Sequence, residues 1–111
     1  AGDERFPCGL HIHCLEDSAL ARQTLQASLG GRMPQSIVKA YGDTVRDVEV
    51  FKDAVLHRCD VAIVDQNLEF PGATMCGTDI IRELKDAGYK NLICVRTVSV
   101  TDADVGLYFQ S

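Results

Sequence analysis

The stretch DVAIVD, residues 60–65, decides the fold. Its apolar run from Val61 to Val64 is short, continuous and bounded by an aspartate at each end. A run of this kind is typical of a strand that is buried on both faces, as strands are when helices cover the two sides of a parallel sheet. The segment therefore predicts a central strand of an α/β fold, with Asp65 at the end where the chain leaves the sheet.

Further strands and helices are predicted on both sides of this segment. Gly30 and Gly31 supply the permissive backbone that can end the first helix. Residues 66–77 are predicted as a loop, and Thr101 can cap a last helix. Strands are predicted at residues 10–15, 36–41 and 91–95, and helices at residues 20–29, 45–55, 78–88 and 101–111.

The predicted elements alternate as βαβαβαβα. Right-handed crossovers convert this order into a parallel sheet with helices on both faces, which is a doubly wound α/β fold. A chain of 111 residues has no room for a second folding unit. Residues 1–9 show no periodicity and are interpreted as a leader or linker, and residues 10–111 as a single domain.

The composition excludes several classes of protein. The formal charge of -5 argues against direct binding of nucleic acid, which requires a basic face. The apolar runs are too short to cross a bilayer and no signal-peptide pattern opens the chain, so a cytoplasmic protein is expected. Five cysteines without a C-x-x-C motif indicate neither a disulfide framework nor a zinc site. Cys14 and Cys94 are expected to be buried, and the role of Cys76 stays open.

Polar side chains follow the predicted strands where ligands gather in open parallel sheets, at the carboxyl ends. Glu16 and Asp17 end the first strand, Asp65 ends the third, and Thr97 follows the fourth. Neighbouring carboxylates repel one another and call for a cation, and Mg²⁺ prefers such oxygen ligands. An aspartate placed there could also act as a nucleophile. His11 and His13 form an H-x-H pattern that leaves a second metal site open as an alternative.

Four segments in this order resemble the receiver domain of two-component response regulators, and the similarity covers roughly residues 10–111. The segments are LEDSALAR (15–22), VAIVDQNL (61–68), GTDIIRELKDAGY (77–89) and LICVRT (92–97). The resemblance implies a flavodoxin-like sheet with strand order 2-1-3-4. It also implies a signalling domain, not an enzyme, in a two-component phosphorelay.

Particular roles follow from the same resemblance. Asp65 would be the phosphoacceptor and Thr97 the switch hydroxyl. Glu16, Asp17 and Asp65 would organise Mg²⁺, together with the main-chain carbonyl of Asn67. The phosphoryl group would come from a histidine kinase or a histidine phosphotransfer protein.

The chain also departs from the family pattern. It stops before the usual fifth strand and helix, and no lysine follows Lys90 to contact the phosphoryl group. The loop after Asp65 is longer than usual for the family. An exposed edge on the fourth strand would invite pairing, so a homodimer or completion by another chain is expected.

Two alternative functions stay open on the sequence. A pseudo-receiver would keep the fold and signal by binding alone, and metal binding discriminates against it. An aspartyl-phosphate phosphatase of the haloacid dehalogenase kind would need an acidic residue two positions after the nucleophile. That position holds Asn67, which cannot act as the general acid.

Overall fold

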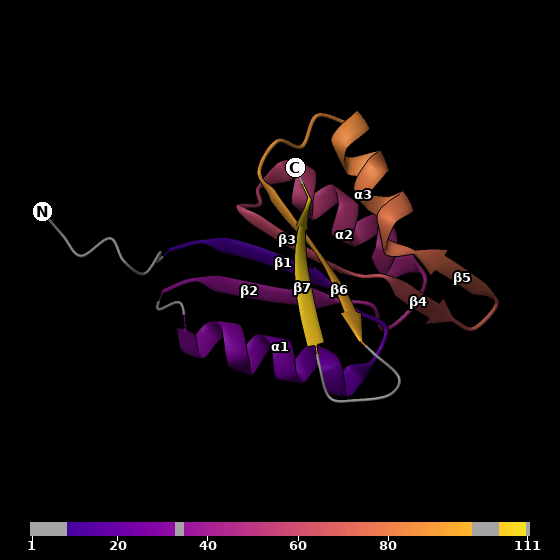
Figure 1. Cartoon of the computed structure of the whole chain (residues 1–111), viewed down its shortest axis with the longest axis horizontal. Coiled ribbons are helices and arrows are strands. Elements are labelled where there is room, and N and C mark those ends of the chain that lie inside the picture. The colour runs from indigo at the N-terminus through magenta and orange to yellow at the C-terminus, as the bar shows by residue number, and fades with distance from the viewer. Residues whose placement is uncertain (1–8, 33–34, 99–104, 111) are drawn as a thin grey trace, which may run out of the picture.

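A parallel sheet forms the centre of the molecule, as predicted (Figure 1). The computed structural model describes residues 9–32, 35–98 and 105–110. Its main sheet has the order β2-β1-β3-β6-β7, and the first four of these strands run parallel to one another. The strands are β1 (His11–Leu15), β2 (Ile37–Tyr41), β3 (Val61–Asp65), β6 (Leu92–Val98) and β7 (Val105–Gln110).

Helices cover both faces of this sheet because its strand residues alternate between two apolar clusters. Ile63 of β3 packs in one cluster, and its neighbours Ala62 and Val64 pack in the other. The first cluster receives side chains from α1 (Ala19–Arg32), and the second receives them from α2 (Arg46–His57) and α3 (Gly77–Asp86). In Figure 1, α1 lies below the strands, and α2 and α3 lie above them. The chain therefore has a mixed α/β architecture, with helices on both faces of the parallel strands, which is compatible with a doubly wound fold.

The first helix is longer than predicted. The expected stop at Gly30 and Gly31 is wrong, because α1 continues through both glycines to Arg32. A glycine inside a helix is tolerated at a cost of about 1 kcal/mol relative to alanine. The helix ends two residues before Pro34 in the sequence, and the residue before a proline disfavours helical backbone.

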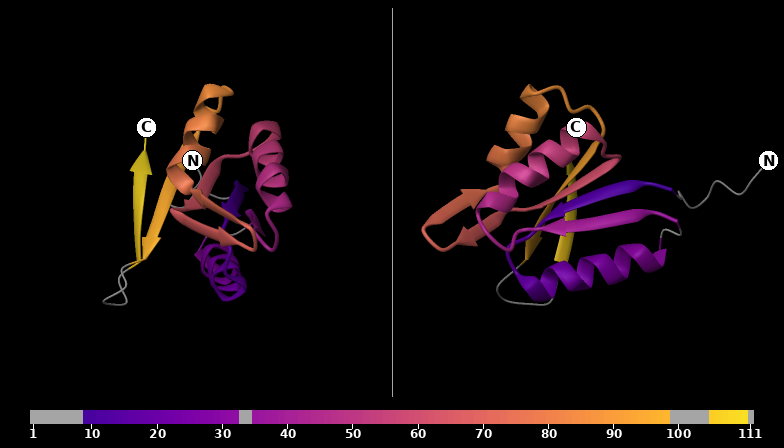
Figure 2. Two further views of the ribbon diagram at one scale, coloured as in Figure 1. Left: turned by 90° about the vertical axis from the view of Figure 1, so that its right-hand side faces the viewer. Right: turned by 180° about the vertical axis from the view of Figure 1, so that it is seen from behind.

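The predicted loop after Asp65 is instead a β-hairpin. Strands β4 (Asn67–Phe70) and β5 (Ala73–Cys76) pair antiparallel in a separate two-stranded sheet. Leu68 and Phe70 are buried in the α2–α3 core, whereas Asn67 and Glu69 are exposed. Alternation of this kind holds one face of the hairpin against the core. Figure 2 shows the hairpin projecting from the end of the sheet.

The C-terminal prediction is also wrong, because residues 105–110 form a strand and not a helix. β7 pairs antiparallel with β6, with Val98 opposite Val105. β6 is therefore not an exposed edge, because β7 adds a fifth strand to the sheet, in the antiparallel direction. The argument for dimerisation that rested on that edge no longer applies. The predicted cap at Thr101 lies outside the described residues, as do residues 1–8 of the predicted leader.

Two further sequence predictions can be compared with the structure. Cys14 and Cys94 are buried, as expected, whereas Cys76 is exposed. Within the part of the chain that is described, no helix combines the length and the apolar character needed to span a membrane.

Candidate functional site

Three carboxylates meet at the carboxyl ends of β1 and β3. Glu16, Asp17 and Asp65 each offer an oxygen atom, and these oxygens all lie within 4.8 Å of one another. The convergence follows from the sheet, because β1 and β3 are parallel neighbours and Leu15 is paired with Val64. The next residue on each strand therefore lies at the same edge. The predicted acidic cluster is present.

Glu16 is held from four directions. Its amide donates to the carbonyl of Tyr41 over 2.9 Å, and its own carbonyl accepts from Nη1 of Arg22 over 2.9 Å. Its carboxylate accepts from the Ser18 amide at Oε2, 2.8 Å, and from Nη1 of Arg96 at Oε1, 2.7 Å. The side chain is 5% exposed. Such burial is tolerable for a carboxylate because both of its oxygens have partners.

Arg96 is a residue of this site that the sequence reasoning missed. It is paired directly with Asp65 in the β3–β6 register, so the two side chains leave the sheet on the same face. One signal in the sequence could have revealed it. A charge that directly continues the apolar run ending at Val95 is expensive to bury unless a carboxylate lies nearby.

Thr97 is the predicted site residue that the structure does not bring to the cluster. It follows Arg96 on β6, and successive strand residues point to opposite faces. Its side chain therefore leaves the sheet on the side of α2 and α3, away from Arg96. Its role as a switch hydroxyl stays a prediction.

The hairpin and α3 border the acidic cluster. The Glu69 amide on β4 donates to Oδ2 of Asp17 over 2.9 Å. Gln66 accepts at its side-chain Oε1 from the Thr78 amide, 3.1 Å, and at its carbonyl from the Gly77 amide, 2.8 Å. These bonds fix the first turn of α3 beside Asp65.

Burial and mutual repulsion make Glu16 and Asp65 hold protons more tightly than free carboxylates do. Burial, with the charge of Asp17, raises the pKa of Asp65 to about 6. Burial, together with contact with Asp17 and the charge of Asp65, raises the pKa of Glu16 to about 7. The guanidinium of Arg96 opposes both shifts without cancelling them. When all three carboxylates are ionised, one guanidinium leaves two negative charges uncompensated, which a divalent cation would offset.

The donor set fits a hard cation. Both oxygens of Glu16 are occupied by hydrogen bonds from Ser18 and Arg96, whereas Oδ2 of Asp17 accepts from the Glu69 amide. Asp17 and Asp65 are therefore the carboxylates best placed for direct ligation. Asn67 is exposed and is the first residue of β4, two residues after Asp65. Its main-chain carbonyl is therefore close to Asp65 along the chain.

The alternative of a histidine metal site loses support. His13 is buried, and both of its ring nitrogens have partners, namely the Arg58 carbonyl and the Tyr41 hydroxyl, each at 3.0 Å. Burial, with the positive charges of Lys39 and His11, lowers the pKa of His13. The ring is best described as a hydrogen-bonded part of the core.

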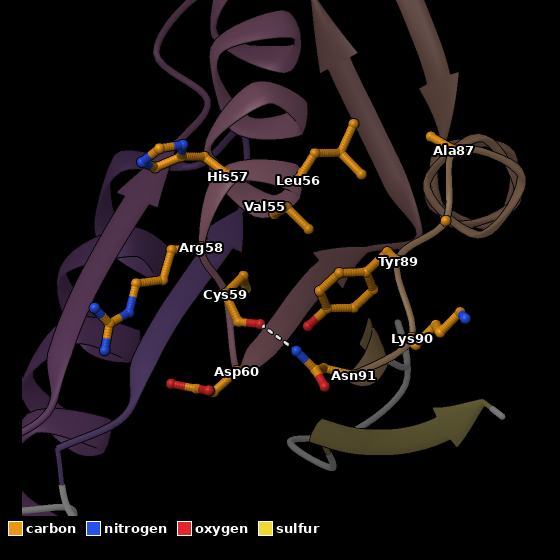
Figure 3. A pocket seen from close by; sticks show the side chains of 11 residues that line it. Val55, Leu56, His57, Arg58, Cys59, Asp60, Ala87, Tyr89, Lys90 and Asn91 are labelled. Carbon is orange, nitrogen blue, oxygen red and sulfur yellow. Dashed lines mark hydrogen bonds between the residues drawn. The ribbon is translucent and has the colours of Figure 1, made fainter.

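A pocket lies at the opposite end of the sheet from the acidic cluster and contains none of its three carboxylates (Figure 3). Its volume is about 420 Å³, and its walls come from the segments before β3 and β6. In this pocket, Nδ2 of Asn91 donates a hydrogen bond to the carbonyl oxygen of Cys59 over 2.9 Å. Tyr89 donates to the carbonyl of Leu92 over 3.0 Å. These polar groups hold two connections together and are not free for a ligand.

Comparisons with protein-family models, curated proteins and solved structures find no match. The function must therefore be argued from the geometry of the acidic cluster.

The raised pKa of Asp65 predicts a pH-dependent stability. The folded state holds this proton more tightly than the unfolded chain, whose aspartates titrate near pH 3.9. The resulting stability is fully present below that pH and is lost as the pH rises through about 6. We expect the free energy of unfolding, measured with urea, to fall between pH 5 and pH 7.5. The fall should be larger for the wild type than for Asp65→Asn by about 1–2 kcal/mol. Parallel pH profiles for the two proteins would contradict the assignment.

Proposed function

We propose that this chain is a phosphoacceptor receiver domain of a two-component phosphorelay, with Asp65 as the residue that takes the phosphoryl group. The observation that carries the proposal is the convergence of Glu16, Asp17 and Asp65 at the carboxyl edge of a parallel sheet. The strand order β2-β1-β3-β6 supports assigning the sheet to the flavodoxin-like class, in which ligands gather at this edge.

The proposed reaction is a phosphoryl transfer from a phosphohistidine to Asp65. A carboxylate oxygen of Asp65 forms a new O–P bond while the P–N bond of the donor breaks. The electron pair of that bond stays on the imidazole nitrogen, which takes up a proton. The product is an acyl phosphate on Asp65, of the kind that aspartate nucleophiles form in other phosphoryl-transfer proteins.

Mg²⁺ is the cation that we propose for the cluster, where it would offset the charge that gathers during transfer. Asp17 and Asp65 would ligate it directly, and the main-chain carbonyl of Asn67 is the further ligand proposed from the family resemblance. Glu16, whose two oxygens are already hydrogen-bonded, would act through water and through the position that it gives to Arg96.

The proposed partner is a histidine kinase or a histidine phosphotransfer protein, and the proposed compartment is the cytoplasm. The domain is proposed as a signal carrier and not as an enzyme. Asn67 stands where a phosphatase of the haloacid dehalogenase kind needs an acid, so release of the phosphoryl group by water should be slow. A long-lived acyl phosphate suits a signal. Self-association into a homodimer stays a prediction that sedimentation can test.

A pseudo-receiver is the second candidate. The hairpin β4–β5 favours it, because Glu69 already occupies one oxygen of Asp17 and the hairpin borders the edge that a phosphodonor must reach. In this alternative the domain signals by docking, and the acidic cluster is a structural remnant. Mg²⁺ binding and phosphorylation separate the two candidates.

The test is the intact mass of the protein after incubation with acetyl phosphate, with and without Mg²⁺. The wild type should gain one phosphoryl group only when Mg²⁺ is present, with acetate as the leaving group. Asp65→Asn should gain none. Asp60→Asn is the matched control, because Asp60 lies just before the other end of β3 and accepts a hydrogen bond from the His11 amide over 2.7 Å. A folded wild type that gains no mass would contradict the phosphoacceptor proposal and would favour the pseudo-receiver instead.

A further inference from the structure

Arg96 is a partly buried cation beside the aspartate to which the proposed function assigns the phosphoryl group. Its side chain is 13% exposed, and Nη1 lies 2.7 Å from Oε1 of Glu16. Among residues 9–32 and 35–98, Glu16 forms this ion pair with Arg96, and Asp65 forms none. The guanidinium is therefore bound to one carboxylate of the cluster while it lies next to another.

The chemistry of arginine suits a larger role than neutralising Glu16. The guanidinium carries five N–H donors in a planar fork and stays protonated at every physiological pH. The ion pair with Glu16 uses one nitrogen, Nη1. The planar fork matches the spacing of phosphoryl oxygens and can bind two of them at once.

The register of the sheet places Arg96 beside Asp65, within the region that a phosphoryl group on Asp65 would enter. Arg96 is the direct partner of Asp65 across the β3–β6 ladder, and residues paired in this way leave the sheet on the same face. Phosphorylation would change a carboxylate with one negative charge into a group that carries about two. The stronger acceptor would then lie next to the guanidinium.

We infer that Arg96 binds the phosphoryl group carried by Asp65 and gives up its ion pair with Glu16 to do so. The inference rests on the proposed function. It assigns to Arg96 the role of counter-charge to that phosphoryl group. Glu16 would keep its hydrogen bond from the Ser18 amide, so its carboxylate would stay partly satisfied after the exchange. Occupancy of Asp65 would thereby change a contact between the end of β1 and β6.

A purely structural role makes different predictions. If Arg96 only compensates the buried Glu16, its guanidinium stays on Glu16 whether or not Asp65 is modified. Substitution would then lower stability without a specific effect on phosphorylation. The two roles therefore differ in a spectroscopic property and in a rate.

The spectroscopic test follows the Nε–H resonance of Arg96 by NMR in the wild type with Mg²⁺, before and after acetyl phosphate. Arg96→Lys identifies the resonance by removing it. A shift of this resonance upon phosphorylation, with the resonance of Arg82 unmoved, is the expected result. Arg82 is a matched reference because it pairs with its own carboxylate, Asp79, at 3.3 Å on the exposed face of α3.

The kinetic test compares phosphorylation of Arg96→Gln, Arg96→Lys and the control Arg82→Gln by intact mass. Arg96→Gln should be phosphorylated roughly ten- to a hundredfold more slowly than the wild type, the range expected for losing a hydrogen bond between charged groups. Arg96→Lys should recover part of the rate, and Arg82→Gln should match the wild type. The NMR measurement on the wild type decides the question even if Arg96→Gln does not fold.

The outcomes separate the inference from the function on which it rests. A wild type that gains no phosphoryl group would overturn both. A wild type that is phosphorylated with an unmoved Arg96 resonance, and an Arg96→Gln variant that reacts at the wild-type rate, would overturn the role of Arg96 alone.

Discussion

Gly42→Ala is expected to lower the free energy of unfolding by about 4 kcal/mol. Gly42 has φ of +133°, a backbone conformation that side-chain-bearing residues rarely adopt. Forcing alanine into such a conformation costs about 1–3 kcal/mol. A Cβ atom there would also lie 2.0 Å from the carbonyl oxygen of Glu16, so the backbone on one side must move. Overpacking of this kind costs roughly another 1–3 kcal/mol.

The measurement is urea unfolding followed by circular dichroism, with the midpoint as the readout. Gly31→Ala is the matched control, because Gly31 lies in α1 and a Cβ atom there meets nothing within 4 Å. Alanine is the better helix former, so this control should stabilise the protein by about 0.5–1 kcal/mol. If Gly42→Ala were as stable as the wild type, the close approach of the backbone at Gly42 to the Glu16 carbonyl would be contradicted.

Gly77→Ala is expected to disturb the site as well as the fold. A Cβ atom at Gly77 would lie 2.3 Å from the carbonyl oxygen of Asp65. Relief requires the first turn of α3 to move away from β3, at a cost of about 2 kcal/mol in the free energy of unfolding. Because the Gly77 amide also donates to the Gln66 carbonyl over 2.8 Å, the connection after Asp65 would shift with it.

Two readouts check the Gly77 prediction. Urea unfolding should report the lost stability, and intact mass after acetyl phosphate and Mg²⁺ should report at least a tenfold slower phosphorylation of Asp65. A displacement of about 1 Å at a reacting group can change a rate by that much or more. Gly30→Ala, where a Cβ atom also meets nothing within 4 Å, should leave the phosphorylation rate unchanged. Equal rates for all three proteins would contradict the proposed closeness of Gly77 to the reacting carboxylate.

The central part of this architecture was predictable because its signals are local. The apolar run before Asp65 predicted a strand that is covered on both faces, and the helix predicted at residues 45–55 is α2, which covers one of these faces. The meeting of Glu16 with Asp65 also followed, since adjacent parallel strands end at a common edge. These predictions need only the direction of each strand.

The hairpin was missed although its pattern was visible. Leu68 and Phe70 alternate with polar neighbours, and Pro71 with Gly72 marks a tight turn, in which Gly72 takes φ of +81°. Residues 66–77 were predicted as a loop instead. The pattern of apolar residues with a period of two carried the better information.

Arg96 and β7 were missed for a different reason, which is that their partners are distant in sequence. The role of Arg96 depends on which residue of β3 lies opposite it, and the register is set only when the sheet assembles. A helix was predicted for residues 101–111 from a capping residue, although Val105, Tyr108 and Phe109 are of types that favour strands. Pairing with β6 decides between these states.

The four-way anchoring of Glu16 makes the acidic cluster part of the cooperative unfolding unit of the domain. The hydrogen bond that Glu16 donates to Tyr41 and those that it accepts from Arg22 and Arg96 join β2, α1 and β6 through one residue. Fluctuations that open one of these elements must therefore disturb the others, and amide exchange at Glu16 should report near-global opening. Any ligand that tightens the cluster would accordingly stabilise the whole domain and not one loop.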